Sequence, residues 1–219
     1  MTIPGLTDFK NLLHGTGNVL LALSENPVLQ SFTFVGGSAL TLYLNHRLSE
    51  DIDLFTWTKT LPVDRLLRNL QKQFADVLYI VSADSAQLDL RINEVKVSFF
   101  AYDWQELQNR HHLHQNLYIA DMDVILAMKL HTLFLRAKYR DYYDLYFLSR
   151  QGYSIKQMYE VTANRIPGMN KRLFQMALVY TDDIADDPIA HLSPKIDVSA
   201  RGISRHFEKQ IRQWLQAGN

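Results

Sequence analysis

The segment FTFVGGSALTLYLNHRLSEDIDLFTW, residues 32–57, determines the fold predicted for this chain. It predicts a short apolar strand over residues 32–35, a Gly-Gly-Ser turn, a short helix from residue 39 to about residue 45, and a second strand that begins at residue 51. Glycine allows the backbone to approach a ligand closely, and the N-terminus of a helix presents free N–H groups to an anion. The turn and the helix together therefore predict a site for a phosphate group.

Two acidic residues, Asp51 and Asp53, begin the second strand. Because side chains alternate along a strand, both carboxylates are expected on one face, while Ile52 and Leu54 point into the core. Carboxylates this close repel one another unless a cation lies between them. Mg²⁺ is typically held by one or two carboxylates together with phosphate oxygens. The pair therefore predicts a site for a divalent cation, Mg²⁺ or Mn²⁺.

The glycine and serine after a strand, followed about a dozen residues later by Asp-x-Asp, resemble the nucleotidyltransferase superfamily. The longer string GGSALTLYLNHRLSEDIDLF, residues 36–55, resembles the AbiEii/AbiGii-type toxin branch, whose members carry a similar GG-[ST]-AL … R-x-S-x-D-[IF]-D block. The resemblance implies that the substrate is an NTP and that Asp51 and Asp53 are catalytic metal ligands. The nucleotide-binding residues that it implies are Gly36, Gly37, Ser38, Arg47 and Ser49.

A second block, DVILAMKLHTLFLRAKYRDYYDLYFLSR over residues 123–150, predicts two helices, the second beginning near Asp141. It resembles the downstream motif of the same family, Ala-x-Lys-hydrophobic followed by Arg-x-Lys-x-Arg-Asp-x-x-Asp-Leu. The resemblance adds Lys129, which would contact the triphosphate, and Asp144, which would orient Lys129 or a metal-bound water, to the catalytic residues. We interpret Asp141 as a helix N-cap. The basic residues between the two helices are either salt-bridge partners or a polynucleotide contact: Arg136, Lys138 and Arg140.

The sequence departs from the superfamily pattern in its later strands, which are predicted at residues 77–83, 87–92 and 95–102. Active members usually carry a third carboxylate there, but Ser98 stands at the expected position. Asp89, on the neighbouring strand, could take this role if the strand register brings it to the same face. An alternative function therefore stays open, that of a nucleotide- or RNA-binding protein of the same fold with little or no turnover.

The composition is that of a globular protein, with 47% apolar residues, 21% charged residues and a formal net charge of zero. Binding of nucleic acid through bulk charge is therefore disfavoured, although a local basic surface is compatible with it. The chain has no cysteine, which excludes disulfides and zinc–thiolate sites and fits a reducing cytoplasm. We expect a cytoplasmic protein without a signal peptide, because the N-terminus MTIPGLTDFK lacks a basic region followed by an apolar run. We also expect no membrane span, because no apolar run approaches the roughly 18 residues that a span needs.

Two further segments have less specific patterns. The connection over residues 103–120 contains His111, His112 and His114 without the spacing or acidic partners of a metal site, and we interpret it as a solvated loop. Residues 195–219 carry five Lys or Arg and two Asp or Glu. We interpret this basic end as a solvated helix face, with contact to RNA as the alternative.

The chain is thus predicted to be an α+β protein. Residues 1–105 would form a small mixed sheet with an N-terminal helix and the nucleotidyltransferase-type site. Residues 106–219 would form a mostly helical region that covers the active-site cleft. The resemblance implies Mg²⁺-dependent transfer of a nucleoside monophosphate from an NTP to an acceptor hydroxyl, with RNA as a candidate acceptor. It also implies the toxin of a toxin–antitoxin pair, whose partner would be a separately encoded antitoxin.

Overall fold

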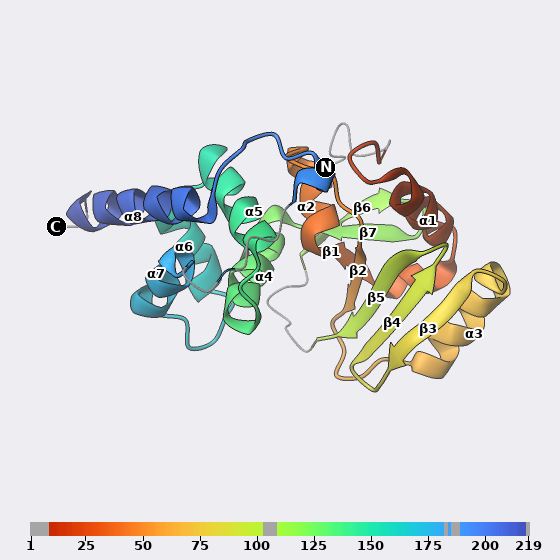
Figure 1. Ribbon diagram of the computed structural model, residues 1–219. Helices are drawn as coiled ribbons and strands as arrows, with labels where there is room; N and C mark the ends of the chain where they lie inside the picture. Colours follow the sequence, from red (N-terminus) through yellow and green to blue (C-terminus); the bar gives the residue numbers. More distant parts are fainter. Residues whose placement is uncertain (1–8, 103–108, 182–183, 185–188, 218–219) are drawn as a thin grey trace. The chain divides into compact units, whose positions relative to one another are not determined.

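The computed structural model describes residues 9–102, 109–181, 184 and 189–217, and they form an α+β fold, as predicted (Figure 1). The chain divides into two compact units after Met122. The sequence places the boundary earlier, between residues 105 and 106. The difference arises because two strands that follow residue 105 belong to the sheet of the first unit.

The first unit contains a seven-stranded mixed sheet with the order β3-β4-β5-β2-β1-β7-β6. Two neighbouring pairs, β1 with β7 and β2 with β5, are parallel, and the other neighbours are antiparallel. The strands are β1 (Thr33–Val35), β2 (Ile52–Thr56), β3 (Leu78–Ala83), β4 (Gln87–Ile92), β5 (Val95–Ala101), β6 (Arg110–His114) and β7 (Leu117–Ala120).

The N-terminal helix of the first unit begins only at residue 14 in the described part of the chain. A later helix, over residues 63–74, buries Leu66, Leu70 and Phe74, which lie on one face at helical spacing. The helical segments are α1 (His14–Ser24), η1 (Pro27–Ser31), α2 (Gly36–Leu44) and α3 (Val63–Phe74).

A tight two-residue turn connects β4 to β5. Asn93 and Glu94 connect β4 to β5 with φ angles of 47° and 65°, the left-handed geometry that a two-residue hairpin needs. This geometry costs conformational energy for residues other than glycine, which explains why Asn-Glu is an uncommon turn sequence.

The prediction of a solvated loop over residues 103–120 is wrong for residues 110–120, which form the β6–β7 hairpin, while residues 103–108 lie outside the described residues. The reason is that β7 pairs in parallel with β1 and contributes buried apolar side chains such as Leu117 and Ile119. His111 on β6 hydrogen-bonds the Asp121 carboxylate, and His112 hydrogen-bonds the carbonyl of Gln115 at 2.7 Å. These histidines therefore have partners within the hairpin region.

The second unit is helical in the described residues. It contains α4 (Met122–Leu135), α5 (Tyr139–Arg150), α6 (Ile155–Ala163), α7 (Lys171–Val179), η3 (Ala190–Leu192) and α8 (Ala200–Ala217), with the first residue of α4 ending the first unit. The last helix, α8, packs against α5, α6 and α7 through a buried face that includes Phe207 and Ile211. Leu215, near the end of the same helix, is exposed. Among the described residues, no helix combines the length and the apolar character that crossing a membrane requires.

Candidate active site

The sequence predicts a separate Gly-Gly-Ser turn before the helix. In the structure this segment instead forms the first turn of α2. Gly36 follows β1 directly and has a φ of +77°, which L side chains rarely adopt. A Cβ atom at Gly36 would also lie 2.3 Å from Oδ2 of Asp53. The Asp53 carboxylate therefore lies against the N-terminus of α2, where the helix dipole favours negative charge.

The predicted nucleotide-binding residues lie together around this helix terminus. Ser38, Arg47 and Ser49 are at most 5% exposed. The Ser38 hydroxyl hydrogen-bonds the Ser49 hydroxyl at 2.8 Å and the backbone carbonyl of Asp51. The Arg47 guanidinium lies over Gly37, so that a Cβ atom there would be 2.6 Å from Nη2. The contacts of these side chains thus hold the first turn of α2 against the loop that precedes β2.

The burial of β2 alternates as the sequence predicts. Ile52 and Leu54 are fully buried, whereas Asp51 and Asp53 are half-buried, the pattern expected if both carboxylates project from one face. Two partly exposed carboxylates supply the hard oxygen donors that Mg²⁺ prefers and leave room for phosphate and water ligands. The described residues contain no group of three or more His, Asp or Glu arranged to hold a metal ion. A cation at this pair would therefore take its remaining ligands from a nucleotide and from water.

The strand register places the candidate third acid in line with Asp53. Asp53 pairs with Ser98 across β2 and β5, and Ser98 pairs with Asp89 across β5 and β4. Directly paired residues project from the same face of a sheet. Asp53, Ser98 and Asp89 therefore form one row across three strands. With strands about 4.8 Å apart, Asp89 lies one strand farther from Asp53 than Ser98 does.

Asp89 is held in its charged form by neighbouring groups. The hydroxyl of Ser98 donates a hydrogen bond to Oδ1 at 2.6 Å, and the amide of Gln87 donates one to Oδ2 at 2.9 Å. Partial burial raises the pKa of Asp89, but these hydrogen bonds, the charge of Lys96 and a hydrogen bond from Ser82 together lower it below its usual value. Asp89 is therefore a carboxylate at neutral pH.

The second unit contains a buried ion cluster built from α4 and α5. Nζ of Lys129 lies 2.9 Å from Oδ1 of Asp141 and 2.7 Å from Oδ2 of Asp144. Both carboxylates are fully buried, and the Lys129 side chain is 8% exposed. The N-cap interpretation of Asp141 is wrong, because Lys138 occupies the N-cap position and Asp141 lies in the first turn of α5, pointing to Lys129. Sequence reasoning missed Asp141 as a cluster member, although it lies one helical turn from Asp144.

Of the basic residues between the two helices, Arg136 is a salt-bridge partner, since its Nε lies 3.6 Å from Oδ2 of Asp141. Lys138 is exposed and Arg140 is half-buried. The cluster thus places two carboxylates beside one buried ammonium and one guanidinium that is 52% exposed. Removing such charges from water costs several kcal/mol per ion, so a buried cluster is weak evidence for stability. Charged groups held in such environments concentrate at functional sites.

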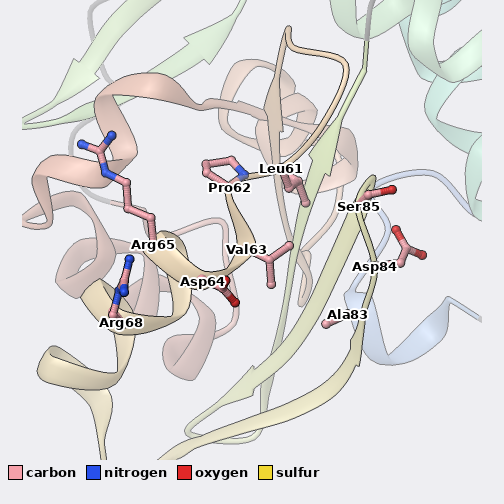
Figure 2. Close-up of a pocket in the computed structure, with 9 residues that line it drawn as sticks. All are labelled: Leu61, Pro62, Val63, Asp64, Arg65, Arg68, Ala83, Asp84 and Ser85. Atoms are coloured by element: carbon pink, nitrogen blue, oxygen red, sulfur yellow. The ribbon is translucent and has the colours of Figure 1, made fainter.

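A surface pocket of the first unit lies away from these residues. It is bounded by Leu61, Pro62 and the first turns of α3 on one side and by residues 83–85 on the other (Figure 2). None of the residues predicted for nucleotide or metal binding lines it. We therefore place the candidate site at the N-terminus of α2 and the adjoining acidic row, where the chemistry of the side chains fits, and not in this pocket.

The geometry of Gly36 gives a direct test of the site. Gly36→Ala is expected to destabilise the protein by about 1–3 kcal/mol, because it combines an unfavourable φ with a clash against the Asp53 carboxylate. Gly37→Ala is the matched control, since the nearest atom there is the end of the flexible Arg47 side chain. Urea unfolding of both variants measures the difference. An equal or larger loss for Gly37→Ala would contradict this account of the turn.

Comparisons with known proteins show similarity over most of the chain. The family model described as "Nucleotidyl transferase AbiEii toxin, Type IV TA system" matches residues 18–215. A protein of Aquifex aeolicus (strain VF5), named as uncharacterized, is 24% identical over 193 residues, which cover 86% of this chain and 90% of that protein.

Solved structures are similar as well. MenT4, a nucleotidyltransferase toxin of Mycobacterium tuberculosis H37Rv, superposes with a TM-score of 0.50 at 14% identity, covering 92% of this chain and 84% of that chain. JHP933 of Helicobacter pylori gives a TM-score of 0.49 at 17% identity, covering 94% and 97%. The family model spans most of the sequence, including both motif blocks. The chain therefore belongs to the AbiEii nucleotidyl transferase toxin family of type IV toxin–antitoxin systems.

Proposed function

We propose that this nucleotidyltransferase moves a nucleoside monophosphate from Mg·NTP to a hydroxyl of an RNA acceptor. In this reaction the acceptor oxygen forms a bond to the α-phosphorus, the bond from that phosphorus to the pyrophosphate breaks, and the hydroxyl proton passes to water. The observation that carries the proposal is the Asp53 carboxylate at the N-terminus of α2, in one row with Ser98 and Asp89. This arrangement brings acidic oxygens and helix N–H groups to one place.

In the first unit, carboxylates would bind the cation and backbone N–H groups would bind the phosphates. Asp51 and Asp53 would hold the divalent cation, which when bound neutralises charge on the phosphate oxygens. The backbone N–H groups of Gly37 and Ser38 would bind the β- and γ-phosphates, because the N-terminus of a helix favours an anion. The buried side chains of Ser38, Arg47 and Ser49 would position this turn rather than contact the nucleotide.

We propose that Lys129 and Asp144 also serve the reaction. Their support is the buried cluster itself, which keeps two carboxylates and an ammonium out of water where apolar side chains would fold at lower cost. In this arrangement Asp144 and Asp141 would fix the position of the Lys129 ammonium, which is one of the two roles that the family resemblance implies for Asp144. A separately encoded antitoxin is the proposed partner, in keeping with the family.

The experiment that tests the function uses labelled substrate. The protein is incubated with each α-labelled NTP, Mg²⁺ and total RNA, and label is then sought in RNA and in protein. Label in RNA with one NTP, lost when EDTA is added, supports the proposal. Label in protein alone would reject RNA as the acceptor. Binding of NTP without any transfer would favour the alternative, a binding protein with little turnover.

The role of the third acid has its own test. Asp89→Asn is expected to lower turnover by about 10²-fold with NTP affinity nearly unchanged, because an interaction made mainly in the transition state affects the rate and not binding. Asp76→Asn, an exposed aspartate in the same unit, is the control. Adding Ser98→Asp to Asp89→Asn moves the acid one strand closer to Asp53 and should restore turnover. If wild type and all three variants transfer label equally fast, Asp89 has no part in the chemistry.

A further inference from the structure

The outward face of α8 carries a line of basic side chains, Arg201, Arg205, Lys209 and Arg212, which we call the α8 stripe. All four are exposed. They fall at positions i, i+4, i+8 and i+11, so they project within about 80° of one another around the helix axis. The first three are spaced about 6 Å apart along that axis. The opposite face of α8, in the blue part of Figure 1, is the one that packs against α5, α6 and α7.

The α8 stripe is poorly neutralised. Arg212 lies 3.7 Å from the carboxylate of Glu208, but no described carboxylate forms an ion pair with Arg201, Arg205 or Lys209. Like charges at i and i+4 on a helix destabilise it. The whole chain has a formal net charge of zero, so this concentration of positive charge does not follow from its composition. A polyanion bound along α8 would relieve the repulsion.

The positive surface extends from α8 onto the end of α5. Arg150, the last residue of α5, is exposed and has no ion-pair partner among the described residues. His206, which follows Arg205 on α8, hydrogen-bonds the hydroxyl of Ser149 on α5 at 2.9 Å. This contact joins the two helices beside Arg150. Burial lowers the pKa of His206, and the charges of Arg150 and Lys209 lower it further. Arg150 and Lys209 therefore both lie near the His206 ring, and the His206 imidazole adds no positive charge at neutral pH.

We propose that the α8 stripe and Arg150 bind the phosphodiester backbone of the RNA acceptor. Arginine and lysine bind phosphates largely without regard to sequence, and the release of counterions supplies most of the affinity. The proposal rests on the proposed function for the identity of the polyanion and adds where that RNA is held. It replaces the interpretation of this helix face as merely solvated, because three of its cations lack a carboxylate partner in the described residues.

The test compares two variants that remove three positive charges each. The first carries Arg201→Gln, Arg205→Gln and Lys209→Gln. The control carries Arg65→Gln, Arg68→Gln and Lys72→Gln, which are exposed residues of α3. The probe is a labelled single-stranded RNA of about 20 nucleotides, without NTP or Mg²⁺, titrated from about 50 to 200 mM KCl. The stripe variant should lose about tenfold or more in affinity at the lowest salt concentration. Its slope of log K against log salt should fall by about 2, since each phosphate contact contributes about 0.7.

Two results would overturn the inference: RNA binding by the stripe variant with the affinity and slope of wild type, or an equal loss in the α3 control. Measuring label transfer in parallel separates this inference from the function. Transfer by wild type together with unchanged RNA binding by the stripe variant rejects the stripe and leaves the function standing. RNA binding through the stripe without transfer to any acceptor supports the stripe and rejects the function.

Discussion

Asp53→Asn is expected to lower the rate of nucleotidyl transfer by about 10³-fold or more while the protein stays folded. The carboxylate lies against the N-terminus of α2 and in the acidic row, so its loss removes charge where a divalent cation and a triphosphate would meet. Removing a single group that stabilises developing charge typically costs 10²- to 10³-fold, and loss of a metal ligand adds to this. The stability cost should stay near 1 kcal/mol, the usual worth of a charge at a helix terminus.

The measurement is the initial rate of label transfer from an α-labelled NTP at saturating Mg²⁺, with Mn²⁺ binding followed by calorimetry as a second readout. Asp64→Asn is the control, because Asp64 is an exposed residue in the first turn of α3. It should retain both activity and Mn²⁺ affinity. Full activity of Asp53→Asn would remove the acidic pair from the mechanism, and unchanged Mn²⁺ affinity would show that the cation binds elsewhere.

Lys129→Met is expected to destabilise the protein by about 3–5 kcal/mol. The substitution leaves Asp141 and Asp144, both fully buried, without the ammonium that lies within 3 Å of each. Breaking a buried ion pair by removing one partner costs this much because the remaining charge is uncompensated. A triple variant that also carries Asp141→Asn and Asp144→Asn removes the leftover charge and should recover most of the loss. Equilibrium unfolding in urea measures both.

Asp144→Asn alone separates stability from function in the same cluster. It keeps the contact between Lys129 and Asp141, 2.9 Å long, so its cost should stay below that of Lys129→Met. If the cluster serves the reaction, this folded variant should lose about 10²-fold or more in transfer rate. Wild-type activity in Asp144→Asn would show that the cluster is only structural. A stability loss as large as that of Lys129→Met would contradict the charge argument.

The parts of the fold that could be predicted are those that depend on residues close together in the sequence. The Gly-Gly-Ser sequence, Asp51 and Asp53 lie within one segment, and their chemistry follows from residue types and strand alternation. The position of Asp89 could not be derived in this way. It depends on the register between β5 and β2, two strands that lie far apart in the chain, in addition to the local register of the β4–β5 hairpin. The sequence could therefore only state the condition under which Asp89 would qualify.

Two errors have a common physical cause, namely tertiary contacts that local patterns do not reveal. The strand β6 is rich in histidine and lies at an edge of the sheet, so it lacks the apolar alternation that identifies a strand. Asp141 lies where the sequence predicts the start of the second helix, which suggested an N-cap. Its burial comes from the packing of α5 with α4 around Lys129. The ion cluster is visible in sequence only through the family motif.

The parallel pairing of β1 with β7 has a consequence for when the enzyme becomes active during its synthesis. Thr33 of β1 is aligned with Tyr118 of β7. Most of the first unit must therefore be synthesised before β1 can pair with β7. Contacts of such long sequence separation form late and slow the folding of a domain. Domains generally fold as units as they emerge from the ribosome. A nascent chain that ends before β7 would carry Asp51 and Asp53 beside an incomplete sheet, so the proposed metal site would be complete only after β7 has paired with β1.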